Sequence, residues 1–292
     1  MIQRPHLNLT DSGFHSFAES MERLGETFAV RDVMVPLSVI EYVAPGEEDR
    51  ARRIVAEKRY SVVPVSEDGQ TFGSVFCTEH PANSDRTITK VRRTSVSDHI
   101  PDSTPLAEAL FLFESREWYF TLRGNRVSGL VTYWAFNSRE FRVQLYAGLS
   151  RVEELSRDAL AKDGCGVANG SGLNLTPQVL QKVRERFESA RQGLGGNRFV
   201  DELQFHQVND ALRKHLPWRN FLHGRLGRSL SEGEYKALYD FTTLRDGVMH
   251  GRVLFPTYGD FRHFPGMIDN IGDFIDYLDA YNAQLAIADS AV

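Results

Sequence analysis

Residues 239–252 bring an arginine, an acidic residue and a histidine close together in the sequence: Arg245, Asp246 and His250. A histidine takes up and releases protons near neutral pH because its unperturbed pKa is ~6.5. An arginine stabilises negative charge that builds up on a phosphate in a transition state. Asp246 could orient either side chain. These residue types therefore suit acid–base chemistry at a phosphate group.

The spacing of the two basic residues leaves a second interpretation open. Five residues of an ideal helix turn the chain by ~500°, which places Arg245 and His250 about 140° apart. Gly247 could distort the helix, or the long arginine could reach around it. The alternative is a structural histidine with a surface arginine, which requires no catalytic role.

The string over residues 239–252 resembles the signature of HEPN domains. These are helical bundles in which an arginine and a histidine, four to six residues apart, form a ribonuclease site. The resemblance implies that Arg245 and His250 catalyse metal-free cleavage of RNA, with the 2′-hydroxyl as the nucleophile. Asp246 is then the polar residue that follows the arginine. It also implies that two such motifs face each other across a homodimer.

A basic stretch upstream is a further hint of RNA binding. Residues 182–228 hold 10 basic and 5 acidic side chains, and they include Trp218, Arg219 and Phe221. A mixture of aromatic and arginine side chains is typical of proteins that bind single strands. A solvated helix face with core aromatics explains the same pattern equally well.

Two sets of short strings in the first half of the chain indicate a second kind of chemistry. The first set contains VRDVM over residues 30–34, SVVPV over 61–65 and DG over 68–69. The second contains SDHI over 97–100, PLAEAL over 105–110 and GLVT over 129–132. Together these strings resemble a tandem pair of CBS domains. The resemblance implies two packed copies, over residues 28–80 and 93–137, with clefts that bind adenine nucleotides such as ATP, ADP or AMP.

In that family a threonine or serine, followed three residues later by an aspartate, contacts phosphate and ribose. Thr132 matches this pattern in the second copy, and Glu79 stands at the aspartate position of the first. Phe76 and Ala135 depart from the pattern. We therefore expect at most one nucleotide site per chain, with Glu79 and Thr132 as its contacts. The alternative is a dimerisation scaffold without ligand.

The elements that must position these residues follow from local patterns. The order strand, helix, strand, turn, strand occurs twice, which indicates an internal repeat. The first copy is predicted to contain a strand over 39–43, a helix over 47–58 and strands over 61–65 and 72–76. The second is predicted to contain a helix over 106–115 and strands over 118–122 and 127–132. Residues 81–93 are polar and are predicted to be a linker.

Strand signals nearly vanish after residue 137. Apolar residues at helical spacing predict helices over 12–25, 139–162, 176–192, 199–216, 231–248 and 267–285. The predicted fold class is α+β, with a tandem CBS pair of mixed α/β structure followed by an all-α helical bundle. The expected boundaries are an N-terminal helical segment over 1–27, the CBS pair over 28–137 and a HEPN-like domain over 138–292.

The composition limits the classes of function. A net charge of −5 argues against a simple polycation that binds nucleic acid by charge alone. The two cysteines, Cys77 and Cys165, are too few and too far apart for a disulfide framework or a metal knot. No stretch reaches the ~18 apolar residues of a membrane span. We expect a cytoplasmic protein that uses no metal and does not engage a membrane, and the two family resemblances imply a homodimer.

The leading hypothesis is a regulated enzyme, in which the CBS pair senses an adenine nucleotide and controls a HEPN-type endoribonuclease. One rival is a non-catalytic dimeric scaffold. Another is a ligand-binding regulator whose helical half contacts a protein partner.

Overall fold

A computed structural model describes residues 21–22, 28–58, 60–69, 72–79, 87–166, 169–194, 198–238, 241–262 and 264–290. They form two compact units. The sheet unit comprises the described residues within Glu26–Gln144 and Val253–Pro265, and the helical unit those within Met1–Gly25, Leu145–Arg252 and Gly266–Val292. Except for Met21 and Glu22, the predicted helix over 12–25 lies outside the described residues.

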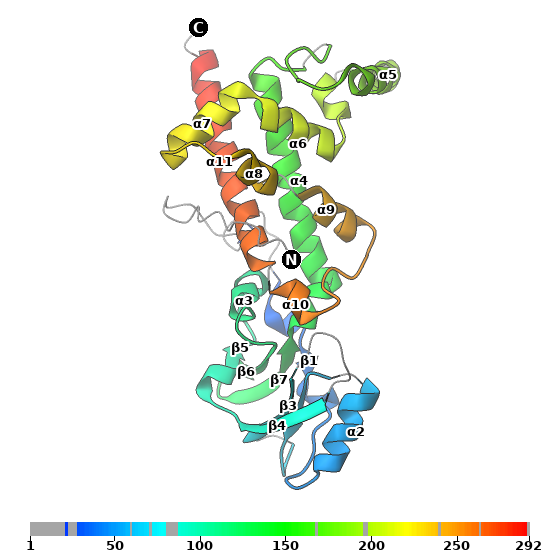
Figure 1. Cartoon of the computed structure of the whole chain (residues 1–292), viewed down its shortest axis with the longest axis vertical. Coiled ribbons are helices and arrows are strands. Elements are labelled where there is room, and N and C mark those ends of the chain that lie inside the picture. Colours follow the sequence, from blue (N-terminus) through cyan, green and yellow to red (C-terminus); the bar gives the residue numbers. More distant parts are fainter. Residues whose placement is uncertain are drawn as a thin grey trace. The chain divides into compact units, whose positions relative to one another are not determined.

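The sheet unit contains two small sheets (Figure 1). In the first, the strand order is β1-β7-β6-β5, and only the β5–β6 pair is parallel. Its strands are β1 (Val35–Pro36), β5 (His99–Pro101), β6 (Trp118–Arg123) and β7 (Arg126–Thr132). The second is antiparallel, in the order β2 (Val62–Val65), β3 (Ser74–Glu79), β4 (Thr87–Arg93). The helices of this unit include α2 (Glu48–Lys58), α3 (Leu106–Leu112) and α10 (Tyr258–Phe261).

Several predicted elements of the repeat are confirmed. The helix over 47–58 is α2, and the strands over 61–65, 118–122 and 127–132 are β2, β6 and β7. The helix over 106–115 is shorter than predicted, and the strand over 72–76 lies slightly later, as β3. The turn between β6 and β7 contains Gly124 with φ of +59°, a conformation that glycine adopts without steric cost.

The prediction of a linker over 81–93 is wrong in its second half, because residues 87–93 form β4. The strand pairs with β3 and lies at the edge of its sheet. Its polar, positively charged sequence is typical of an edge strand, where charge prevents pairing with another chain. Polarity alone therefore does not distinguish an edge strand from a linker.

The predicted strand over 39–43 is also wrong. The chain pairs with β7 only at Val35 and Pro36, and then forms a short 3₁₀ helix over Leu37–Val39. Pro36 has no N–H to donate to a ladder, so the pairing is not extended. Only Val43 rejoins a sheet, through a single parallel bridge to Val65.

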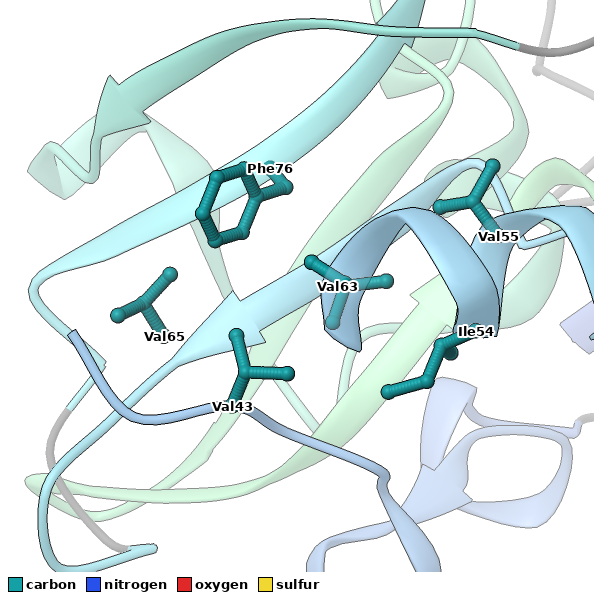
Figure 2. Close-up of a cluster of buried hydrophobic side chains, with 7 residues drawn as sticks. Val43, Ile54, Val55, Val63, Val65 and Phe76 are labelled. Atoms are coloured by element: carbon teal, nitrogen blue, oxygen red, sulfur yellow. The ribbon is translucent and has the colours of Figure 1, made fainter. Parts of the chain in front are cut away.

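A hydrophobic core fixes α2 on the second sheet. Figure 2 shows Ile54 and Val55 of α2 near Val63 of β2 and Phe76 of β3. All four are at most 8% exposed. Helix α2 therefore covers one face of this sheet.

The opposite face of β2 and β3 contributes to a second core, which lies between the two sheets. Because side chains alternate along a strand, Val62 and Val75 face away from the α2 core. Each repeat gives three side chains to this second core: Val62, Phe72 and Val75 from the first, and Trp118, Phe120 and Leu130 from the second. The rings of Phe72 and Phe120 stack with their centroids 5.2 Å apart.

A segment distant in sequence completes the sheet unit. Residues 253–265 return to it, although they follow most of the helical unit along the chain. The Asn137 side chain accepts hydrogen bonds from the backbone N–H groups of Leu254 and Phe255, at 2.8 and 2.9 Å. The Tyr258 hydroxyl donates to the Phe113 carbonyl at 2.7 Å. These contacts attach the segment by backbone and side chain together.

The helical unit confirms most of the predicted helices. The first and last long helices are α4 (Arg139–Lys162) and α11 (Pro265–Ser290), which begin in the sheet unit, and α5 spans Pro177–Leu194. The apolar face predicted for α4 is buried, with Leu145, Leu149, Val152 and Leu155 at most 3% exposed.

The remaining helices are divided more finely than predicted. The helix over 199–216 is a 3₁₀ turn over Phe199–Glu202 followed by α6 (Phe205–Lys214), and an additional helix, α7, spans Leu216–Leu226. The region over 231–248 contains α8 (Glu232–Leu238) and α9 (Phe241–Met249). Among the described residues, no helix combines the length and apolarity needed to cross a membrane.

Candidate ligand-binding site

A cavity of about 510 Å³ opens in the sheet unit where β7 ends. Thr132, the last residue of β7, lies in its wall. Small-molecule sites typically occupy about 300–1,000 Å³, so the cavity has the size of a ligand site. Its lining residues come from both repeats: Val35, Val39, Ile40, Glu41, Lys58, Tyr60, Ser61, Val62, Pro64, Leu130, Thr132, Tyr133, Trp134 and Pro256.

The cavity is mainly apolar and carries aromatic rings at its mouth. Tyr60 is 40% exposed and Trp134 is 51% exposed. Tyr133 is buried, and its ring meets Trp134 edge to face, with centroids 6.4 Å apart. Large aromatic rings that remain exposed beside a cavity offer faces on which a planar ligand can stack.

The cavity also contains an ion pair. Lys58, the last residue of α2, bonds to Glu41, and both side chains are more than one-third exposed. The hydrogen bond to Glu41 raises the pKa of Lys58. The ammonium is therefore fully protonated at neutral pH, and it can bind an anionic ligand group by exchanging its partner.

The two residues predicted to contact nucleotide are placed differently. Thr132 lines the cavity, whereas Glu79 ends β3 in the other sheet, and its side chain lies outside the described part of the chain. Ala135 belongs to a 3₁₀ helix over Tyr133–Asn137 that follows β7 directly. Of these two residues, Thr132 is therefore the one that lines this cavity.

Strand register shows which residues of the two repeats correspond. Val62 begins β2 and pairs with Cys77, and Trp118 begins β6 and pairs with Thr132. Val62 and Trp118 both belong to the core between the sheets. The register therefore matches Thr132 with Cys77, one residue after Phe76.

The region around Cys77 is filled by β4. Arg92 of β4 donates to the Asp98 carboxylate at 2.6 Å, and its guanidinium lies 5.2 Å from the centroid of the Trp118 ring. Arg116 also donates to Asp98, whose side chain is fully buried. Although burial favours the neutral acid, the hydrogen bond from Arg92 contributes to a pKa of Asp98 below its usual value. This buried carboxylate is thus ionised and shared by two arginines.

The residues predicted for RNA cleavage lie in the helical unit. Arg245 and Asp246 are in α9, and His250 follows the helix as an exposed residue. Gly251, with φ of +61°, ends the helix, and its N–H donates to the Val248 carbonyl. The helix continues through Gly247 to Met249, so the predicted distortion at Gly247 is absent from this part of the described chain.

His250 is not among the described residues that line the pocket of Arg245. Arg245 lies 3.5 Å from a Glu153 carboxylate oxygen, and its guanidinium lies 5.4 Å from the Phe205 ring centroid. It lines an open pocket of about 400 Å³, together with Tyr146, Ser150, Glu153, Glu154, Arg157, Arg198 and Asp201. The catalytic role of Arg245, Asp246 and His250 therefore stays a prediction.

Within the basic stretch over residues 182–228, Trp218 fits the interpretation as a core aromatic residue. This residue is fully buried in α7, and its ring contacts Phe274 and Tyr281 of α11. Arg219 lies over the Tyr235 ring at 4.4 Å. Trp218 is thus a core residue and not a stacking platform for bases.

Sequence reasoning missed the aromatic and charged members of the cavity. Tyr60, Trp134 and Lys58 lie just outside the strings that carry the family resemblance. The signal available in the sequence was a tryptophan two residues after Thr132, just beyond the end of a predicted strand. Among the described residues, no three His, Cys, Asp or Glu side chains are grouped so as to hold a metal ion.

No family model matches this sequence, and none of the curated proteins matches it. Among solved structures, the chain is similar to the CBS domain of a bacterial CNNM/CorC family Mg²⁺ transporter in complex with ATP. The identity is 22%, the match covers 41% of this chain and 91% of that chain, and the TM-score is 0.30. A second structure of this CBS domain gives 21% identity, coverages of 41% and 78%, and a TM-score of 0.30. A third, in complex with an inhibitor, gives 19%, coverages of 40% and 77%, and 0.28.

Proposed function

We propose that the sheet unit is a CBS-type sensing module that binds one adenine nucleotide per chain in the cavity beside Thr132. The observation that carries this proposal is the cavity itself, where a strand-end threonine, exposed aromatic rings and a lysine come together. The repeat of strand, helix and strands supports the CBS interpretation.

The lining of the cavity suits a nucleotide in three respects. Trp134 and Tyr60 offer aromatic faces to a planar base. The Thr132 hydroxyl can donate to a phosphate oxygen or accept from a ribose hydroxyl. Lys58 supplies a positive charge for phosphate, with Glu41 as its partner when no ligand is bound.

The filled region around Cys77 supports a single site per chain. The matching place in the other repeat is occupied by Arg92, Asp98 and Trp118, which bind one another. A ligand there would have to displace an ion pair whose carboxylate is fully buried, at a cost of several kcal/mol. Glu79 stays a proposed contact, and its test is separate from that of Thr132.

Calorimetric titration of the full chain with ATP, ADP, AMP and S-adenosylmethionine tests this function. We expect one site per chain and an affinity that falls about tenfold or more in Lys58→Met, because a charge-assisted hydrogen bond to phosphate is lost. The matched control is Arg50→Met, since Arg50 is another exposed, ion-paired cation of α2 that lies outside the cavity lining. Absence of binding, or two equal sites, would contradict the proposal.

A regulatory protein also needs an output, for which the helical unit is the candidate. We propose metal-free RNA cleavage by Arg245 and His250, assisted by Asp246, in a homodimer. The observation that bears on it is the open pocket in which Arg245 lies together with Arg157 and Arg198. The non-catalytic rival is a unit that contacts a protein partner.

Cleavage of single-stranded RNA in EDTA decides between the two. The ribonuclease proposal predicts that His250→Ala lowers the rate by ~10²–10⁴, the typical worth of acid–base assistance, and that Arg245→Ala has a similar effect. His206→Ala is the matched control, because His206 is another exposed histidine of the helical unit. Wild-type protein that cleaves no RNA, with or without nucleotide, favours the protein-partner rival.

A further inference from the structure

A cysteine, a histidine and an aspartate form a chain of contacts in the helical unit. The Cys165 sulfur lies 3.8 Å from His215 Nδ1. The opposite ring nitrogen, Nε2, is hydrogen-bonded to Asp163 Oδ2. Tyr281 donates its hydroxyl proton to the same carboxylate oxygen at 3.0 Å. The imidazole thus lies between a thiol and a carboxylate.

Backbone geometry holds this group in place from three directions. Asp163 and Cys165 follow the end of α4, His215 lies between α6 and α7, and Tyr281 belongs to α11. His215 is 5% exposed and Cys165 is 7% exposed. The backbone N–H of His215 donates to the Leu212 carbonyl at 3.0 Å, which fixes the backbone that carries the ring.

The hydrogen bonds assign the protons. Asp163 Oδ2 accepts from Tyr281, and it can also accept from His215 only if Nε2 carries the proton. In the neutral ring with this tautomer, Nδ1 is unprotonated and faces the thiol as a base. Burial, together with the Asp163 carboxylate, raises the pKa of the Cys165 thiol, so little thiolate exists until a base removes the proton. His215 is the group placed to do so.

The loop around the sulfur restricts which reagents can reach it. A Cβ atom at Gly172, whose φ is +78°, would lie 2.8 Å from the Cys165 sulfur. A Cβ atom at Gly166 would lie 2.7 Å from the Leu173 side chain. Gly172 therefore lets the loop pack directly on the sulfur, so a reagent can approach only through the small exposed part of Cys165.

We propose that Cys165, His215 and Asp163 form a peroxide-reactive site, in which hydrogen peroxide oxidises Cys165 to a sulfenic acid. His215 Nδ1 removes the thiol proton, and the thiolate attacks one peroxide oxygen. An S–O bond forms as the O–O bond breaks, and the departing hydroxide takes the proton from His215 and leaves as water. Sulfur is oxidised and peroxide is reduced, so no other reactant is required. Asp163 is the positioning residue, because it orients and stabilises the protonated ring.

The chain contains its own control for this proposal. Cys77 is the other free cysteine, and it is more exposed than Cys165. Burial alone therefore predicts faster oxidation of Cys77, whereas the proposed site predicts faster oxidation of Cys165. The comparison needs no variant, so it decides the question even if a substitution prevents folding.

The experiment treats the full chain with hydrogen peroxide, traps sulfenic acid with dimedone and quantifies both cysteine peptides by mass spectrometry. We expect Cys165 to react at least about tenfold faster than Cys77, and this difference to disappear in urea. His215→Gln should slow Cys165 by ~10² or more, the low end of acid–base assistance, and leave Cys77 unchanged. Asp163→Asn should also slow Cys165.

The sign of the change separates a chemical role from a packing role. Loosening of the loop would expose the sulfur and speed its oxidation, whereas loss of the base or of its orientation slows it. Wild-type Cys165 that reacts no faster than Cys77 would overturn the proposal. So would His215→Gln or Asp163→Asn protein in which Cys165 reacts as fast as in wild type or faster.

Discussion

The two repeats of the sheet unit end in matching strands but differ in the space beside them. Thr132, at the end of β7, faces a cavity of about 510 Å³. Cys77, its counterpart in β3, lies where Arg92 covers Trp118 and binds Asp98. The difference arises from the strands beside β3 and β7. Strand β4 pairs with β3 past Cys77 and supplies Arg92, whereas β1 pairs with β7 only at Gly129 and Leu130 and does not reach Thr132. A long edge strand therefore closes one of two related places, and a short one leaves the other open.

The largest expected effect is a loss of stability when the ion pairs of Asp98, near Cys77, are removed. Asp98→Ala leaves Arg92 and Arg116 without their shared carboxylate, and we expect the free energy of unfolding to fall by about 3 kcal/mol, the low end for breaking a buried ion pair. Urea unfolding, followed by tryptophan fluorescence, measures it. The control is Asp102→Ala, because Asp102 is also buried but bonds to an arginine that is 69% exposed. An Asp98→Ala loss no larger than that of Asp102→Ala would contradict this account.

The same pair predicts a pH dependence with a defined sign. The pKa of Asp98 is lower in the folded chain than the ~3.9 of an unfolded aspartate. Its contribution is therefore fully present above about pH 4 and is lost as the pH falls through the folded-state value. The stability difference between wild type and Asp98→Ala should shrink in acid. A difference that stays constant down to pH 2 would show that charge is not its source.

The next largest effect is expected on nucleotide affinity at the cavity beside Thr132. Trp134→Ala removes an aromatic face from the cavity mouth, and we expect the affinity for adenine nucleotide to fall about tenfold or more, because base stacking is worth ~1–3 kcal/mol. Calorimetry measures it. Since Trp134 is half exposed, folding stability should change little. Leu216→Ala, at an exposed position of the helical unit, is the control. Unchanged affinity in Trp134→Ala would mean that the base lies elsewhere.

The smallest effect is expected at Thr132 itself. Thr132→Val keeps the shape of the side chain and removes one hydroxyl, which costs ~1 kcal/mol of binding, or about fivefold in affinity. Thr132→Ser retains the hydroxyl and should bind like wild type. Equal losses in both variants would assign the effect to the methyl group and remove the hydroxyl from the proposed contact.

Local patterns were sufficient for many elements. The apolar spacing of residues 139–162 predicted α4 with its bounds, and Gly124 marked the turn between β6 and β7. These features depend on periodicity and on backbone conformations that few residues adopt, so they can be read from neighbouring residues. The same reasoning failed over 39–43 and 87–93, where pairing with a distant strand, or its absence, determined the structure.

The candidate sites divide in the same way. Neighbouring residues were enough to predict that Thr132 ends a strand, and the spacing of Arg245 and His250 is a property of the sequence. That Thr132 shares a cavity with Trp134 and Lys58 follows only from the folded chain, as does the position of His250 outside the pocket of Arg245 among the described residues.

The contacts among Cys165, His215 and Asp163 could not be predicted from the sequence either. Cys165 and His215 are 50 residues apart, and neither belongs to a motif. Spacing along the chain specifies how a helix or strand presents its side chains, because those conformations repeat at a fixed period. It does not specify which ends of separate elements meet, since this depends on how buried faces pack across the whole unit.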